Sequence, residues 1–162
     1  MCGIIGISSN KSVSANIINS LKKLEYRGYD SAGVATLFDG EINEVKSEGR
    51  VDNLEQNFDL KSLKGNIGIG HVRWATHGVP NSINAHPHSS DNVSVVHNGI
   101  IENSTILKKH LINKGHTFKS QTDTEVIVHL ITENLKTIEL EEAITKTLKQ
   151  LHGSFALGIV FK

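Results

Sequence analysis

The only cysteine of the chain, Cys2, lies one residue from the amino terminus and opens a short apolar run. Removal of Met1, which a residue as small as cysteine normally permits, would leave the Cys2 thiol beside a free α-amine. An α-amine has an ordinary pKa of about 8 and a thiol one of about 8.5, so the amine can take the thiol proton. This pairing is typical of an N-terminal nucleophile. The simpler interpretation is a small buried residue that opens a strand.

A second group of polar residues follows a predicted strand over residues 66–72. It holds an arginine, the only tryptophan, a threonine and a histidine, which are Arg73, Trp74, Thr76 and His77. The planar guanidinium of an arginine suits bidentate binding of a carboxylate. The alternative is an arginine–aspartate pair at the surface, with Trp74 in the core.

Two more candidates lie further along the chain. Asn98 and Gly99 follow a predicted strand over residues 93–97, where a side-chain amide and a backbone N–H could bind one oxygen as an oxyanion hole. Asn-Gly is also a common turn dipeptide. Asp123 could meet a substrate ammonium group, or it could simply favour the first turn of a helix.

A pair of histidines, His86 and His88, flanks Pro87. A His-x-His pair could begin a metal site, but the further ligands of a specific zinc pattern are missing. No glycine-rich phosphate loop follows a predicted strand. The sequence therefore predicts no metal and no cofactor.

Alternating strands and helices must position these side chains. Strands are predicted over residues 2–7, 34–38, 41–46, 66–72, 93–97 and 154–161. Helices are predicted over residues 13–24 (capped by Ser12 or Ser14), 51–58, 101–114, 125–135 and 140–151. Asp39-Gly40 indicates a hairpin, and Thr122 with Glu125 matches a capping box. The pattern favours an α/β or α+β layered domain.

The charge balance narrows the class of protein. Lys+Arg and Asp+Glu number 17 each, so the formal net charge is zero. Neither nucleic acid nor a membrane surface is therefore an expected partner. Apolar runs are too short to span a bilayer, and no secretory signal precedes Cys2. With one cysteine, we expect a reducing, cytoplasmic setting.

The motifs in their order resemble one family. The chain is similar to the glutaminase domain of glutamine–fructose-6-phosphate aminotransferase, a class II glutamine amidotransferase with the N-terminal nucleophile hydrolase fold. The residues that carry the resemblance are Cys2–Ile4, Arg27–Gly33, His71–Gly78, Ala85–His88, His97–Asn103 and Thr122–Glu125. The sister family, amidophosphoribosyltransferase, shares the Cys-Gly start but differs in the loops that contain Tyr29-Asp30 and Arg73–His77. The resemblance implies a four-layer αββα sandwich of mostly antiparallel sheets, of the α+β class.

The resemblance also implies roles for single residues. The nucleophile would be Cys2, oriented by Arg27, and its α-amine would be the base. An oxyanion hole would be formed by Asn98 and the Gly99 amide. Arg73 would bind the α-carboxylate of L-glutamine and Asp123 its α-ammonium group. The loop that closes over glutamine would contain Trp74, Thr76 and His77, and supporting roles would fall to His86 and His97.

The same resemblance predicts that the chain is incomplete at its carboxyl end. Residues 1–162 would be one truncated glutaminase domain. A sugar isomerase domain, which would bind fructose 6-phosphate and receive the ammonia, would follow in the full-length enzyme and is absent here. A homodimer is compatible with this expectation. Two other hypotheses stay open, namely a glutamine-binding chain without turnover and the amidophosphoribosyltransferase glutaminase.

Overall fold

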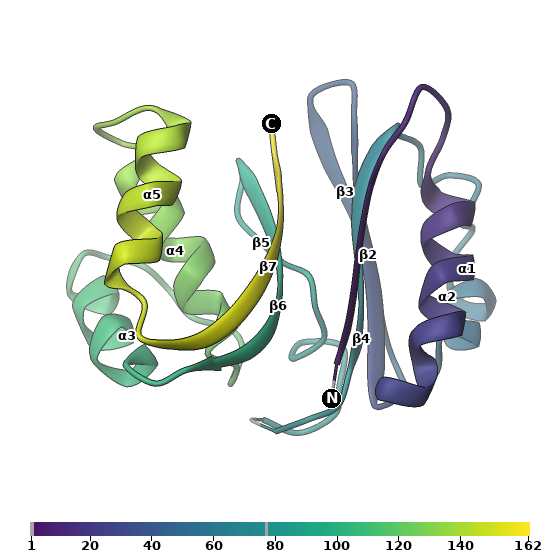
Figure 1. Ribbon diagram of the computed structural model, residues 1–162, viewed down its shortest axis with the longest axis horizontal. Helices are drawn as coiled ribbons and strands as arrows, with labels where there is room; N and C mark the ends of the chain where they lie inside the picture. Colours follow the sequence, from purple (N-terminus) through teal and green to yellow (C-terminus); the bar gives the residue numbers. More distant parts are fainter. Residues whose placement is uncertain (1, 77) are drawn as a thin grey trace.

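The computed structural model describes residues 2–76 and 78–162. Two sheets lie face to face, and helices cover the outer face of each, so the molecule has four layers in the order helix, sheet, sheet, helix (Figure 1). The four-stranded sheet has the order β1-β4-β2-β3, and the three-stranded sheet has the order β5-β6-β7. All strand pairs are antiparallel. The four-layer α+β arrangement expected from the sequence is confirmed.

The elements fall in two halves along the chain. The first half contains β1 (Gly3–Ser8), α1 (Ser14–Leu24), a 3₁₀ turn (Glu25–Arg27), β2 (Ser31–Phe38), β3 (Glu41–Glu48), α2 (Val51–Asn57) and β4 (Ile67–Arg73). The second half contains β5 (His88–Ser89), β6 (Val93–Ile101), α3 (Ser104–Asn113), α4 (Thr124–Asn134), α5 (Leu140–Gln150) and β7 (Gly153–Phe161). Each half therefore forms one sheet with its own helices.

Apolar residues fill the three spaces between the four layers. Ile17 and Leu21 of α1 are fully buried against the first sheet. Between the two sheets a small cluster includes Ile69 of β4 and Val96 of β6. The glycines of β4 permit the close approach of α1, because a Cβ at Gly70 would lie 2.6 Å from Ile17. Burying apolar side chains at about 25 cal/mol per Å² is the main stabilising term of such layers.

The predicted hairpin is confirmed. Phe38 pairs with Glu41, and the two residues between them, Asp39 and Gly40, both have positive φ values, 51° and 74°. Two central residues with positive φ define the type I′ turn, whose twist matches that of the flanking strands.

Several predicted boundaries and caps are wrong. The strand that contains Asn98 and Gly99 continues to Ile101, so this dipeptide is not a turn, and α3 begins only at Ser104. Neither serine caps α1, which has Val13 at its N-cap. Thr122 does not cap α4, because its hydroxyl bonds to His88 and Ser120 instead. For β6 and Thr122 a tertiary partner competes successfully with the local one, whereas the hydroxyls of Ser12 and Ser14 lie 3.4 Å from each other.

No helix within the described residues is long and apolar enough to cross a membrane.

Candidate active site

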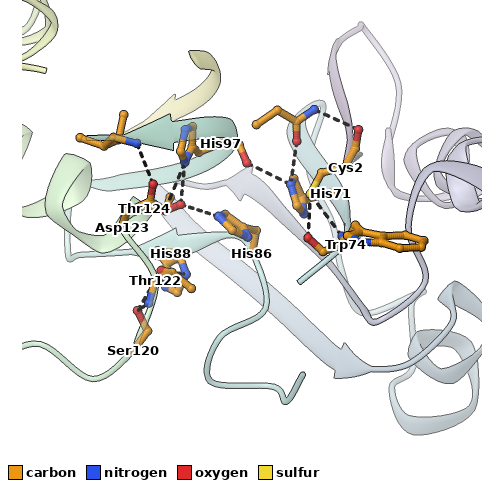
Figure 2. Close-up of polar contacts among 12 residues, drawn as sticks. Cys2, His71, Trp74, His86, His88, His97, Ser120, Thr122, Asp123 and Thr124 are labelled. Carbon is orange, nitrogen blue, oxygen red and sulfur yellow. Dashed lines mark hydrogen bonds and ion pairs between the residues drawn. The ribbon is translucent and has the colours of Figure 1, made fainter. Parts of the chain in front are cut away.

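Cys2 lies at the junction of β1 with the end of β4. Gly3 pairs with Val72, which brings the residue before β1 beside the residues after β4. The backbone N–H of Trp74 donates to Cys2 Sγ over 3.2 Å, and the thiol lies 3.5 Å from the Trp74 carbonyl oxygen (Figure 2). The pairing of these two strands therefore fixes the thiol against the polar loop after β4.

A cavity of about 30 Å³ opens beside Cys2. Its lining comes from both sheets and from the start of α4, and it consists of Cys2, Arg73, Trp74, Thr76, His86, His97, Gly99, Thr122, Asp123 and Thr124. The structure thus gathers six of the nine candidate residues around one space. A seventh, His77, lies outside the described residues.

The guanidinium of Arg73 is inside this site. Only 3% of the residue is exposed, so the alternative of a surface ion pair is wrong. The guanidinium donates to the carbonyl oxygens of Gly78 (3.3 Å) and Val79 (3.5 Å). Burial lowers the pKa of Arg73, while the charges of Cys2, Asp30 and Asp123 oppose that shift. An arginine stays charged at neutral pH even so, and this one faces the cavity as a cation.

The carboxylate of Asp123 joins α4 to β6. Its Oδ2 accepts a hydrogen bond from the backbone N–H of Ile101 over 2.8 Å, and it makes no capping bond to its own helix. Its Oδ1 lies 3.8 Å from Nδ1 of His97. A negative charge therefore faces the same cavity as the cation of Arg73.

The backbone N–H of Gly99 lies on the edge of β6 that faces away from β7. Glu102 N donates to His152 on the β7 side of the sheet, whereas Ile101 N donates to Asp123 on the other side. Because successive N–H groups of a strand point to opposite edges, Gly99 N–H lies on the same edge as that of Ile101. It is therefore directed away from β7 and toward the cavity.

The two remaining candidates approach Cys2 from another side. Arg27 Nε and Asn98 Nδ2 each donate to the Cys2 carbonyl oxygen over 3.2 Å. Both line a neighbouring hollow of about 270 Å³, which Cys2 also borders. The structure thus brings eight of the nine candidates into contact with Cys2 or with the cavity beside it.

Trp74 is at the rim of the site. It is 47% exposed, so the alternative of a core tryptophan is wrong. Its indole makes an edge-on contact with the ring of Tyr29, at 6.1 Å between centroids. Because the backbone N–H of Trp74 bonds to the Cys2 thiol, its exposed indole is close enough to cover a ligand in the cavity.

Four buried histidines connect the two halves of the site. Figure 2 shows His71, His86 and His97 between Cys2 and Asp123, whereas His88 lies below Asp123 beside Thr122 and does not line the cavity. Burial lowers the pKa of His71 and of His88 to about 3, and it also lowers those of His86 and His97. All four imidazoles are therefore neutral at neutral pH.

Hydrogen bonds join these imidazoles to hydroxyl groups at the start of α4. The Thr124 hydroxyl lies 2.7 Å from Nε2 of His86 and 2.9 Å from Nδ1 of His97. His88 Nε2 lies 2.9 Å from the Thr122 hydroxyl. Sequence reasoning missed both threonines, because Thr122 and its neighbours matched a capping pattern that fully explained their residue types.

His71 was also missed as a site residue. Its signal was a polar side chain within an otherwise apolar and glycine-rich strand, and the structure buries it completely. Within the described ranges, no group of three or more His, Cys, Asp or Glu residues could hold a metal ion.

The fold and this cavity define a glutamine amidotransferase domain. Residues 71–162 match the glutamine amidotransferase domain family, and the chain belongs to that family.

Curated relatives of the whole chain are glutamine–fructose-6-phosphate aminotransferases (isomerizing). The protein from Mesorhizobium japonicum is 55% identical over 163 residues, which cover 100% of this chain and 27% of the relative. The protein from Pyrococcus horikoshii is 53% identical over 99% of this chain and 27% of the relative. The chain thus spans about a quarter of the length of these relatives.

Solved structures agree with this assignment. Glutamine phosphoribosylpyrophosphate amidotransferase from B. subtilis superposes with a TM-score of 0.87 at 31% identity, over 99% of this chain and 35% of that one. A glutamine aminotransferase class-II domain protein from Silicibacter pomeroyi has a TM-score of 0.61 at 17% identity, which supports the fold alone.

Proposed function

We propose that this chain hydrolyses the side-chain amide of L-glutamine to glutamate and ammonia, with Cys2 as the nucleophile. The observation that carries the proposal is the placement of Cys2 on a cavity whose lining also includes a cation, a carboxylate and a glycine of β6. These groups come from Arg73, Asp123 and Gly99. Together they match the two charged ends of a free amino acid and the oxyanion that forms at its side-chain amide.

Substrate binding would use opposite charges at the two sides of the cavity. Arg73 binds the α-carboxylate and Asp123 the α-ammonium group, because each group prefers a partner of opposite charge in a buried setting. Trp74 and Thr76 would belong to a loop that closes over the bound glutamine; His77, the third residue assigned to this loop, lies outside the described residues. Closure excludes water and keeps the released ammonia from bulk solvent.

The reaction then has two steps. The α-amine of Cys2, freed by removal of Met1, takes the thiol proton, and the thiolate attacks the amide carbon of glutamine to form a carbon–sulfur bond. The α-ammonium group of Cys2 then gives its proton to the leaving nitrogen of the glutamine amide. The carbon–nitrogen bond breaks, and ammonia is released. Water next attacks the γ-glutamyl thioester, the carbon–sulfur bond breaks, and glutamate leaves with the thiol restored.

The negative oxygen of each tetrahedral intermediate needs donors. We assign this role to the Asn98 side-chain amide and the Gly99 N–H. The Asn98 side-chain amide has two N–H groups. One donates to the Cys2 carbonyl oxygen, and the other is left to donate to the oxyanion. Arg27 orients Cys2 through the same carbonyl oxygen.

In the longer protein that the curated relatives represent, the ammonia would pass to fructose 6-phosphate in a sugar isomerase domain. Residues 1–162 would then be part of the glutaminase domain of that enzyme, and a homodimer is compatible with this role. A reducing cytoplasm suits a reaction that depends on a free thiol.

The test is glutamate release by protein whose intact mass shows that Met1 has been removed. We expect turnover with the natural chain and none with Cys2→Ala, since Cys2 supplies the only thiol of the sequence. A glutamine-like electrophile should add to the Cys2 thiol and leave Cys2→Ala unlabelled. Folded, Met1-free protein that releases no glutamate would overturn the proposal.

The same assay, combined with thermal unfolding in the presence of glutamine, separates hydrolysis from binding alone. A chain that only binds glutamine would be stabilised by it against thermal unfolding without releasing ammonia. The amidophosphoribosyltransferase alternative shares the chemistry of this domain, but the solved protein of that name is 31% identical, against 55% for the aminotransferase from Mesorhizobium japonicum. The higher identity favours the aminotransferase.

A further inference from the structure

The nucleophile and the oxyanion donor come from different sheets. Cys2 precedes β1 in the four-stranded sheet, and Asn98 lies in β6 of the three-stranded sheet. Reaction geometry tolerates errors of well under an ångström, so the two sheets must be held in register at this point. Apolar packing between sheets is not directional and cannot supply such precision alone.

A directional contact does cross between the sheets here. His71 of β4 points from the first sheet into the space between them and is fully buried. Its Nε2 lies 3.1 Å from the backbone oxygen of His97 and 3.0 Å from Oδ1 of Asn98, both on β6 (Figure 2). The same imidazole lies 4.2 Å from the His86 ring, centroid to centroid, which limits its rotation.

The two partners of this nitrogen fix its protonation. A backbone oxygen can only accept, so Nε2 must carry the proton, and His71 is the Nε2–H tautomer. That N–H then needs an acceptor at Asn98, which sets Oδ1 toward His71 and Nδ2 toward Cys2. The reverse orientation would place Oδ1 against the Cys2 carbonyl oxygen, where two acceptors would repel each other.

We propose that His71 is a positioning residue: its Nε2–H fixes the polarity and the place of the Asn98 amide, so that the oxyanion donor of one sheet faces the nucleophile of the other. This inference rests on the proposed hydrolysis of glutamine. Burial lowers the pKa of His71 to about 3, so its imidazole is neutral at every pH at which the enzyme would work.

Variants at position 71 test this role. His71→Gln carries an N–H donor the same number of bonds from Cα as Nε2, His71→Asn carries one that is too short, and His71→Met fills the space with no donor. We expect His71→Met and His71→Asn to lower kcat by about tenfold or more with KM for glutamine nearly unchanged, as for a weakened oxyanion donor. His71→Gln should restore most of the loss.

Two controls separate positioning from general stability. His88→Met removes a buried imidazole of the same cluster that contacts Thr122 rather than Asn98, so it should lower stability as His71→Met does but leave kcat of the folded protein nearly unchanged. In an Asn98→Ala background, His71→Met should lower kcat no further. The proposal would be overturned if His71→Met lowered kcat as much in the Asn98→Ala background as in the wild type. It would also be overturned if His88→Met lowered kcat as much as His71→Met.

An NMR measurement decides the matter independently of turnover. Nitrogen-detected spectra should show His71 as the Nε2–H tautomer, and His71→Met, but not His71→Gln, should shift the side-chain amide resonances of Asn98. A His71 found as the Nδ1–H tautomer would refute the positioning role even if glutamine is hydrolysed. A wild-type chain without turnover would refute the proposed function and leave this measurement to judge His71.

Discussion

At the scale of single residues, the site consists of groups that each satisfy a structural partner and a proposed substrate contact at once. Asp123 is an example, since one carboxylate oxygen accepts from the Ile101 N–H and the other faces the cavity near His97. Arg73 likewise donates to two backbone oxygens while its charge faces Cys2. A substitution can therefore remove the structural contact, the substrate contact or both. Two different substitutions at one position can show which contact causes which effect.

Two substitutions of Asp123 make this separation. Asp123→Asn keeps an oxygen that can accept from Ile101 but removes the charge, so we expect KM for glutamine to rise roughly tenfold or more with little change in stability. Asp123→Ala also leaves the buried Ile101 N–H without a partner, which should cost a further ~1–3 kcal/mol of unfolding free energy. Steady-state kinetics and urea unfolding measure the two effects. Equal stability of both variants would contradict the structural role.

At the scale of elements, the site depends on where strand ends meet. The nucleophile precedes β1, Arg73 ends β4, Gly99 lies within β6 and Asp123 precedes α4. The 3₁₀ turn after α1 packs on the end of β4, because Gly28 lies directly against the backbone of Arg73 and Trp74. This contact requires a residue without a Cβ at position 28.

Replacing Gly28 by alanine tests this contact between elements. A Cβ there would lie 2.7 Å from the Trp74 backbone nitrogen, which bonds to Cys2 Sγ, whereas the φ of Gly28, 173°, suits any residue. We expect Gly28→Ala to cost ~1–3 kcal/mol in stability through overpacking and to lower glutamine turnover strongly.

Gly6→Ala in β1 is the matched control. Its Cβ would meet only Ile69, at an ordinary 3.9 Å, so stability and turnover should change little. Thermal unfolding and glutamate release would be measured for both variants. Equal turnover of the two would show that the close approach at Gly28 does not position the site.

At the scale of the whole molecule, two halves of the chain pack through their sheets, and buried neutral histidines lie at one end of that interface. Their ordinary pKa is 6.5, and burial lowers those of His71 and His88 to about 3. The unfolded chain therefore binds protons between pH 6.5 and 3 that the folded chain does not bind. Stability must fall as the pH is lowered through this window.

Acid unfolding measures this effect. Each of these two histidines should contribute a slope of about 1.4 kcal/mol per pH unit below its ordinary pKa. Burial raises the pKa of Glu125, but its hydrogen bonds outweigh burial and lower that pKa to about 2, so further stability is lost below pH 4.5. Urea unfolding at a series of pH values should show the loss beginning near pH 6.5. A wild-type slope no steeper than that of His88→Gln would contradict the prediction.

Local patterns allowed much of this protein to be predicted from its sequence. Helical periodicity and the signals of helix ends indicated the five helices of the described residues, and Asp39-Gly40 indicated the hairpin, because these features depend on neighbours in the chain. The order of the motifs indicated the family and the nine candidate residues. The direction of Gly99 N–H could not be read in this way, because it depends on which edge of β6 faces β7.

Tertiary structure alone decided how the groups around Cys2 meet. Thr122 and Thr124 matched a helix start, yet their hydroxyls bond to buried histidines from distant parts of the chain. His71 and Asn98 are 27 positions apart, and only the packing of one sheet on the other makes them partners. The sequence by itself determined which groups are present and which elements carry them. Their hydrogen-bond partners followed from the stacking of the sheets, because a buried polar group bonds to whatever the fold places within its reach.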